Sequence, residues 1–155
     1  MKKVFGFGEQ LSIGNLGEQD FLKYYKELSP KKSLDDKAID FTLGDGKLVE
    51  LKSDSYDLNL TPNFFIEMYG NVENSSFGGP FKAMKDKIDF FVYYFPKNKT
   101  FFWFDTVKLC YTAEKIILDL KLKPKYIRNK TWTTLGYAIN RDSLKEILIK
   151  TDIFN

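Results

Sequence analysis

The sequence predicts a mixed α/β domain in which a β-sheet is flanked by helices. Segments with apolar side chains at helical spacing alternate along the chain with short segments rich in β-branched and aromatic residues. Glycine, proline and asparagine mark the turns between them, and no repeat or low-complexity stretch interrupts the pattern. The length of 155 residues suits one domain covering residues 1–155.

In the first half of the chain, a helix and a β-hairpin are the main expected elements. Apolar side chains at helical spacing indicate the helix, and Ser29-Pro30 ends it. The hairpin follows from Gly44-Asp45-Gly46, a three-residue loop of a common hairpin type. In order, we expect a short strand or lead-in at residues 4–8, a helix from Asn15, strands at residues 38–43 and 47–52, and a strand at residues 63–69.

In the second half, an almost continuous apolar run at residues 89–95 predicts a strand buried on both faces in the middle of the sheet. Proline is well tolerated in the first turn of a helix, so Pro80 marks the start of one helix. Pro124 ends a second helix further along the chain. In order, we expect a helix from Pro80 to about Lys87, strands at residues 89–95 and 99–104, a helix at residues 106–120, a strand at residues 136–139, and a helix at residues 142–150 capped by Asn140 or Asp142.

The amino-acid composition excludes several kinds of chemistry. The chain has no histidine, which rules out Ser-His-Asp and Cys-His catalysis and His-containing zinc sites. Cys110 is the single cysteine, so it makes no internal disulfide, and we interpret it as a filler of either the core or the surface. Any chemistry must therefore use carboxylates, lysine, tyrosine or a metal ion. The net charge of +3 permits a phosphate-binding face without requiring one.

The chain has no apolar run of the roughly 18 residues needed to span a bilayer, and no signal-peptide pattern follows Met1. We therefore expect a cytoplasmic protein with no membrane partner. The richness in Lys, Asn, Ile, Phe and Tyr resembles a translation of AT-rich DNA, which suggests a phage or a low-GC bacterium as the source.

The hairpin carries the chemistry. If its turn is centred on Asp45, paired positions sum to 90, so Asp40 lies opposite Glu50, and Lys52 shares their face. Carboxylates that face each other across a sheet repel unless a cation or proton lies between them. Mg²⁺ suits this position, with the backbone carbonyl of Leu51 and waters as further ligands. The opposite face of the hairpin is apolar and consists of Ile39, Phe41, Val49 and Leu51.

Asp40, nine intervening residues and Glu50-Leu51-Lys52 together resemble the signature of the PD-(D/E)XK nuclease superfamily. The resemblance implies a restriction-endonuclease-like mixed sheet and hydrolysis of DNA phosphodiesters with Mg²⁺, for which Mn²⁺ can substitute. It also implies that Asp40 and Glu50 bind the metal and that Lys52 assists the nucleophile. Ile39 stands where the family has a proline, which weakens the signature. A solvated strand face is the alternative interpretation of these three residues.

Glu18 precedes Phe21, Leu22 and Tyr25 on the first expected helix and lies on its apolar face. In many members of the family, including small phage and archaeal Holliday-junction resolvases, a glutamate on the first helix completes the metal site, and the resemblance gives Glu18 this role. The alternative is structural. With Asn15 as N-cap, Glu18 occupies the third helical position, where a capping-box glutamate is expected.

Other features suggest contacts with DNA phosphates. Residues 75–80 followed by Lys82 and Lys85 could present backbone N–H groups, a helix N-terminus and two ammonium groups to DNA. A flexible loop before an amphipathic helix explains this segment equally well. Glu67 is a weaker candidate for the metal site, since an edge-strand charge also explains it. A basic cluster, which is either a backbone contact or solvated surface, consists of Lys121, Lys123, Lys125, Arg128 and Lys130.

These observations predict a metal-dependent DNA endonuclease, of a phage-type junction-resolving or DNA-processing kind, with DNA as its partner. An enzyme of this kind would act as a homodimer in order to cut two strands. The alternative function is a non-catalytic nucleic-acid-binding or protein-interaction module on the same fold.

Overall fold

The computed structural model describes residues 7–33 and 39–155. Its elements confirm the predicted mixed α/β class, with helices and both parallel and antiparallel strands. In chain order they are α1 (Phe7–Tyr24), η1 (Lys26–Leu28), β1 (Lys31–Lys32), β2 (Phe41–Thr42), β3 (Leu48–Ser53), β4 (Asn63–Asn71), β5 (Ser76–Phe77), α2 (Gly79–Lys85), β6 (Phe90–Phe95), η2 (Pro96–Asn98), β7 (Thr100–Asp105), α3 (Thr106–Asp119), β8 (Lys125–Arg128), β9 (Thr133–Asn140), η3 (Arg141–Ile147) and β10 (Leu148–Ile153), where η marks a 3₁₀ helix.

The larger sheet has six strands in the order β1-β2-β3-β6-β7-β10. The pair β3–β6 is parallel and the other neighbours are antiparallel. Between β3 and β6 the chain crosses over through β4, β5 and α2, as a parallel pair requires a long connection. As predicted, β6 and β7 lie in the interior of this sheet.

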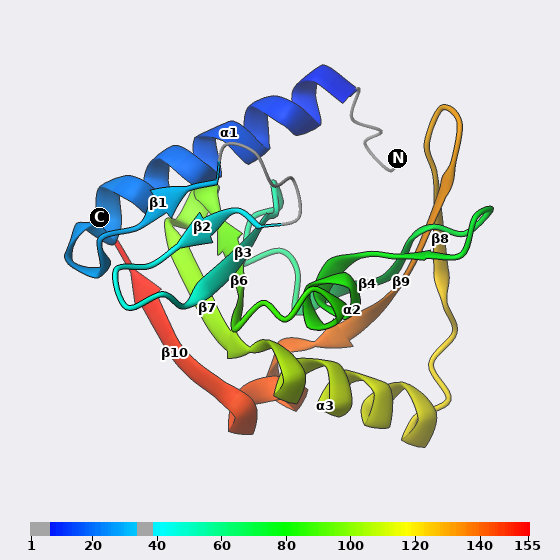
Figure 1. The fold of residues 1–155 in the computed structure, drawn as a ribbon. Helices are drawn as coiled ribbons and strands as arrows, with labels where there is room; N and C mark the ends of the chain where they lie inside the picture. The colour runs from blue at the N-terminus through cyan, green and yellow to red at the C-terminus, as the bar shows by residue number, and fades with distance from the viewer. Residues whose placement is uncertain (1–6, 34–38) are drawn as a thin grey trace.

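A second sheet of four strands has the order β5-β4-β9-β8. The strand expected at residues 63–69 therefore belongs to this sheet as β4, next to β9. Figure 1 shows that the far ends of these strands project beyond the rest of the molecule as two hairpin tips. We call residues 121–140, which contain β8 and β9, the β8–β9 arm.

Helix α1 covers one face of the six-stranded sheet (Figure 1). Phe21 and Tyr25 of the helix are buried, and the Phe21 ring stacks on that of Phe41 with centroids 4.6 Å apart. The indole Nε1 of Trp103 donates to the Tyr25 hydroxyl at 2.9 Å, and this hydroxyl donates to Asp152 at 2.7 Å. These contacts fix the C-terminal end of α1 on the strands β7 and β10.

The other face of the sheet packs against α2, α3 and the second sheet. This core contains Phe64 of β4, Phe81 of α2 and Phe91 of β6. Cys110 of α3 is buried in the same core, and burial raises the pKa of its thiol to about 12. The cysteine therefore fills space in the core, as predicted.

A close approach between α1 and β3 sets the position of the helix along the sheet. A Cβ atom at Gly17 would lie 2.0 Å from the Oγ atom of Ser53, so any larger residue would force the Ser53 side chain to move. The neighbouring residue Glu18 reaches Lys32 of β1.

Three expectations were wrong or need correction. Helix α1 begins at Phe7 instead of Asn15, so residues 7 and 8 are helical, while residues 4–6 lie outside the described part of the chain. Residues 142–150 form no α-helix, because η3 is followed by β10, which pairs with β7. The predicted cap is nevertheless present in η3, where the Asn140 side chain accepts from the Asp142 N–H at 2.9 Å.

None of the helices that the structure describes is long and apolar enough to cross a membrane.

Candidate functional site

The hairpin that carries the candidate site has the predicted register. Phe41 pairs with Val49 and Thr42 pairs with Leu48, so the paired positions sum to 90. Gly46 has a φ of 87°, in the left-handed region that a glycine tolerates in such a loop. The structure thus places Asp40 and Glu50 at facing positions, with the carboxylate of Asp40 just beyond the start of β2.

Just before β2 begins, the Asp40 side chain takes the place of a backbone partner for β3. Its Oδ2 atom accepts a hydrogen bond from the Leu51 N–H of β3 at 2.7 Å. This bond holds the carboxyl group against the middle of β3. Burial raises the pKa of the Asp40 carboxyl to about 6, although the Leu51 hydrogen bond acts in the opposite direction.

Glu50 points away from α1. Its neighbours Val49 and Leu51 pack in the core under α1, and side chains alternate along a strand. The Oε2 atom of Glu50 is buried and has no hydrogen-bond partner among the described residues. Burial, followed by the charge of Asp40, raises the pKa of the Glu50 carboxyl to about 9. An unpartnered buried oxygen next to a second carboxylate is a position that a cation would stabilise.

Basic side chains surround this pair. Lys52 lies two residues after Glu50 on β3, is exposed, and lowers the pKa of Glu50 through its charge. Lys82 of α2 lowers the pKa of both Asp40 and Glu50 in the same way. The structure therefore brings together Asp40, Glu50 and Lys52, as predicted, and adds Lys82 from a different part of the chain. Ile39 departs from the prediction, because it packs against the core on the side of Glu50.

Glu18 lies in the interior of α1, so Asn15 is no N-cap and the capping-box interpretation is wrong. Its Oε2 atom makes an ion pair of 2.6 Å with Nζ of Lys32. The charge of Glu18 also raises the pKa of Asp40, which shows that the two carboxylates are near each other. Among the side chains that the structure describes, those of residues 13–33 and 39–155, however, no three acidic or cysteine groups converge in a way that could hold a metal ion.

Lys32 is the residue that sequence reasoning missed. It belongs to β1, pairs with Glu18, and its charge acts on Asp40 as well. Its pKa is raised mainly by the hydrogen bond and the charge of Glu18. A strand of two residues after a proline has no periodicity to reveal it, and the contact with α1 is not local in sequence.

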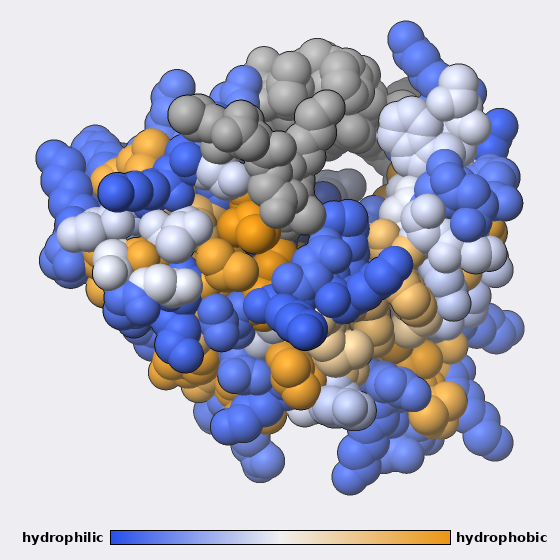
Figure 2. All heavy atoms as spheres, in the orientation of Figure 1, coloured by the Kyte–Doolittle hydropathy of each residue, from blue (hydrophilic) through white to orange (hydrophobic). Residues whose placement is uncertain are grey.

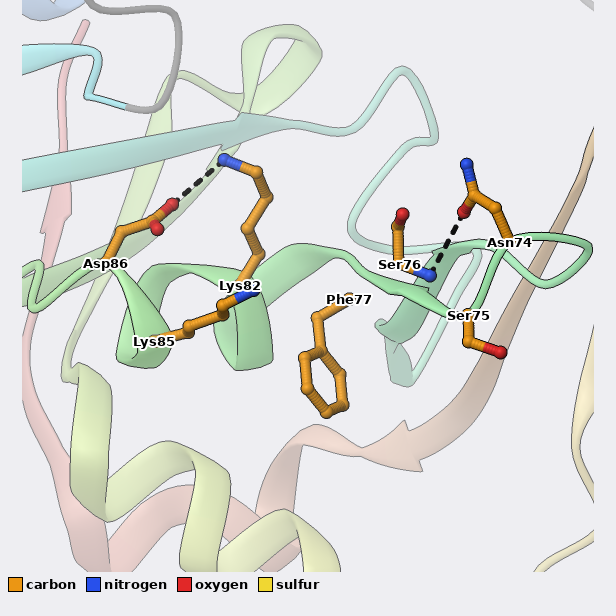
Figure 3. Close-up of a pocket in the computed structure, with 7 residues that line it drawn as sticks. All are labelled: Asn74, Ser75, Ser76, Phe77, Lys82, Lys85 and Asp86. Carbon is orange, nitrogen blue, oxygen red and sulfur yellow. Dashed lines mark hydrogen bonds and ion pairs between the residues drawn. The ribbon is translucent and has the colours of Figure 1, made fainter.

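Lys82 and Lys85 line a pocket between α2 and the β4–β5 turn (Figure 3). Nζ of Lys82 also forms an ion pair of 2.9 Å with Asp86. The pocket has a volume of about 410 Å³, and its lining consists of Asn74, Ser75, Ser76, Phe77, Lys82, Lys85 and Asp86. Figure 2 shows hydrophilic side chains gathered over α2 on this face of the molecule.

One detail of this region differs from the prediction. The N-terminus of α2 packs closely on Glu67, since a Cβ atom at Gly78 would lie 2.8 Å from Cδ of Glu67. The start of α2 is therefore not free to bind a phosphate group. Glu67 lies on β4 opposite Gly136 of β9, and β5 pairs with β4 only from Tyr69 onward.

Comparison of the chain with protein-family models, curated proteins and solved structures finds no match. Membership of the PD-(D/E)XK superfamily therefore stays a prediction that depends on the residues of the hairpin.

Proposed function

We propose that this protein is a Mg²⁺-dependent DNA endonuclease with a restriction-endonuclease-like active site on the β2–β3 hairpin. One observation carries the proposal: Asp40 and Glu50 lie at facing positions in the continued β2–β3 register with raised pKa values, and a buried oxygen of Glu50 has no hydrogen-bond partner among the described residues. Two such carboxyl groups cost stability unless a proton or a cation neutralises them. A structural hairpin has no need of this arrangement.

The residues present fit a magnesium ion. Carboxylate oxygens of Asp40 and Glu50, with the backbone carbonyl of Leu51, are the hard ligands that Mg²⁺ prefers, and Mn²⁺ accepts the same set. When bound, such an ion polarises a phosphodiester and lowers the pKa of water. A third carboxylate is not required for such a site, because Mg²⁺ keeps several waters and takes phosphate oxygens of the substrate as ligands.

Lysine side chains of the chain would orient the attacking water and bind the DNA phosphates. Lys52 is exposed beside the carboxylate pair, where its ammonium group orients the attacking water or stabilises charge on the phosphate. Lys82 and Lys85 would hold a neighbouring phosphate of DNA above α2. We propose a junction-resolving or DNA-processing enzyme that acts as a homodimer in the cytoplasm, since one hairpin site serves one strand.

The decisive experiment incubates the purified protein with supercoiled plasmid and with a synthetic four-way junction. Each substrate is tested with Mg²⁺, with Mn²⁺ and with EDTA. Lys52→Ala is expected to lose cleavage by at least about 100-fold, the size of effect found when one group that stabilises a transition state is removed. Lys115→Ala, which removes an exposed lysine of α3, is the matched control and should cleave like the wild type.

Cleavage that requires the metal ion and is lost only in Lys52→Ala supports the nuclease and identifies its preferred substrate. Intact DNA in every lane rejects the proposal.

Lys32 gives a separate prediction about the metal site. Because Lys32 neutralises Glu18 and acts on Asp40, we expect it to compete with a metal ion for these carboxylates. Lys32→Met should bind Mn²⁺ about twofold more tightly in the absence of DNA, a small effect because the Lys32 ammonium group is exposed to solvent. Isothermal titration calorimetry measures this affinity.

Lys31→Met is the matched control for Lys32, because adjacent residues of a strand point to opposite faces. Weaker Mn²⁺ binding by Lys32→Met than by Lys31→Met would contradict the prediction.

A second candidate function is a nucleic-acid-binding or protein-interaction module without catalysis. It is favoured by the pairing of Glu18 with Lys32 and by the lack of a three-carboxylate group in the described residues. This candidate predicts that Asp40→Asn binds DNA as the wild type does and that EDTA changes nothing.

A further inference from the structure

We propose that the β8–β9 arm, residues 121–140, is a binding surface for the phosphate backbone of double-stranded DNA, independent of base sequence. The inference rests on the proposed function and extends it, because it assigns the substrate-binding surface to a part of the chain outside the carboxylate site.

Charge is the first observation. Residues 121–132 contain five basic residues and no acidic ones, namely Lys121, Lys123, Lys125, Arg128 and Lys130. Taking these five from the 24 Lys and Arg residues leaves 19 against 21 Asp and Glu residues, so the rest of the chain is negative by two charges. The net charge of +3 therefore arises from the arm, and a polyanion would be attracted to this part of the surface.

The shape and exposure of the arm are the second observation. All five basic side chains are exposed. Strand β8 is the edge of its sheet, and all four of its residues are exposed. Figure 1 shows this strand and the turn after it projecting from the body, and Figure 2 shows that hydrophilic and neutral side chains cover this projection. A duplex could approach the arm without displacing any other part of the described chain.

The third observation is that the arm connects to the candidate active site through a series of contacts. Arg128 pairs with Glu73 of the β4–β5 turn at 2.8 Å, and Glu73 also accepts from the Thr133 N–H at 2.9 Å. The same turn forms one wall of the pocket whose other wall carries Lys82 and Lys85.

Lys82, whose charge acts on Asp40 and Glu50, is thus linked to the arm through the β4–β5 turn, where Glu73 pairs with Arg128. A DNA backbone could follow this path, with one phosphate at the hairpin and others along β8. This continuity favours DNA over an anionic membrane, for which the carboxylate pair would have no use.

The test measures binding of a fluorescent 30-base-pair duplex by anisotropy in EDTA, over a range of salt concentrations. Lys125→Ala/Lys130→Ala removes two charges from the arm. Lys108→Ala/Lys115→Ala removes two exposed charges from α3 and is the matched control. Each lost phosphate contact lowers the slope of log K against log salt by about 0.9, so the arm variant should lose roughly 2 from the slope and at least about tenfold in affinity at 0.1 M salt. Circular dichroism checks that both variants are folded.

Equal slopes for the two variants would overturn the inference, as would a wild-type protein that binds phosphatidylserine vesicles but no duplex. The two proposals fail separately. If the wild type cleaves DNA and the arm variant binds and cleaves as well as the control, only the arm is rejected. If DNA binding depends on the arm but no variant or metal condition gives cleavage, the nuclease is rejected and the arm is supported.

Discussion

Glu50→Gln is expected to abolish Mg²⁺-dependent DNA cleavage while the metal-free protein becomes more stable. Glutamine has the shape of glutamate without its charge, so it cannot serve as an anionic ligand of the metal ion. In the metal-free protein the same change removes a carboxyl group whose ionisation is opposed by burial and by Asp40. Catalysis and folding therefore respond in opposite directions.

We expect cleavage to fall by at least about 100-fold, corresponding to about 2.7 kcal/mol or more of lost transition-state stabilisation. Cleavage of supercoiled plasmid measures the first effect, and thermal unfolding in EDTA at pH 8 measures the second. Glu114→Gln, at an exposed glutamate of α3, is the control and should change neither quantity. A Glu50→Gln protein that cleaves normally would remove Glu50 from the site.

The hairpin could be predicted in detail because its determinants are local. Two glycines around Asp45 fix the loop, and the loop fixes the register. Alternation then decides which side chains share a face, so the facing positions of Asp40 and Glu50 follow from a few adjacent residues. The interior strands β6 and β7 were predictable for a similar reason, since two short apolar and aromatic runs separated by the turn at Pro96 fit strands buried on both faces.

The parts that sequence reasoning missed depend on contacts between distant segments. In residues 147–153 every second side chain is β-branched, a pattern that is compatible with a strand. The strand forms because it pairs with the edge of β7. The assignment of β4 to a second sheet depends on pairing with β9, about 70 residues further along the chain. Lys32 meets Glu18 only after β1 and α1 have both packed against the sheet.

These misses also explain why Glu18 was ambiguous. From sequence, the start of a helix is uncertain by several residues, and a glutamate three residues after an asparagine fits a cap. With α1 beginning at Phe7, Glu18 lies in mid-helix, and its partner is Lys32. Glu18 is therefore explained by its ion pair with Lys32 beside Asp40, and not by a role as a helix cap.

The metal-free protein is expected to lose stability as the pH rises from 5 to 8. The folded state raises the pKa of Glu50 from 4.5 to about 9 and that of Asp40 from 3.8 to about 6. Between these values the folded protein keeps protons that the unfolded chain has released, so the free energy of unfolding falls with rising pH, by up to about 1.4 kcal/mol per pH unit for Glu50. The sequence has no histidine, so few other groups titrate in this window.

Urea unfolding in EDTA at pH 5 and pH 8 measures this dependence, and we expect the wild type to be less stable at pH 8 by at least about 2 kcal/mol, allowing for partial solvation of the pair. Glu50→Gln should show a much smaller difference, because its side chain does not titrate. Addition of Mg²⁺ at pH 8 should restore stability to the wild type and not to the variant, since a metal ion stabilises the folded state that binds it. An equal pH dependence in both proteins would mean that the Glu50 carboxyl is solvated and already charged, and would remove the electrostatic reason for a cation at this hairpin.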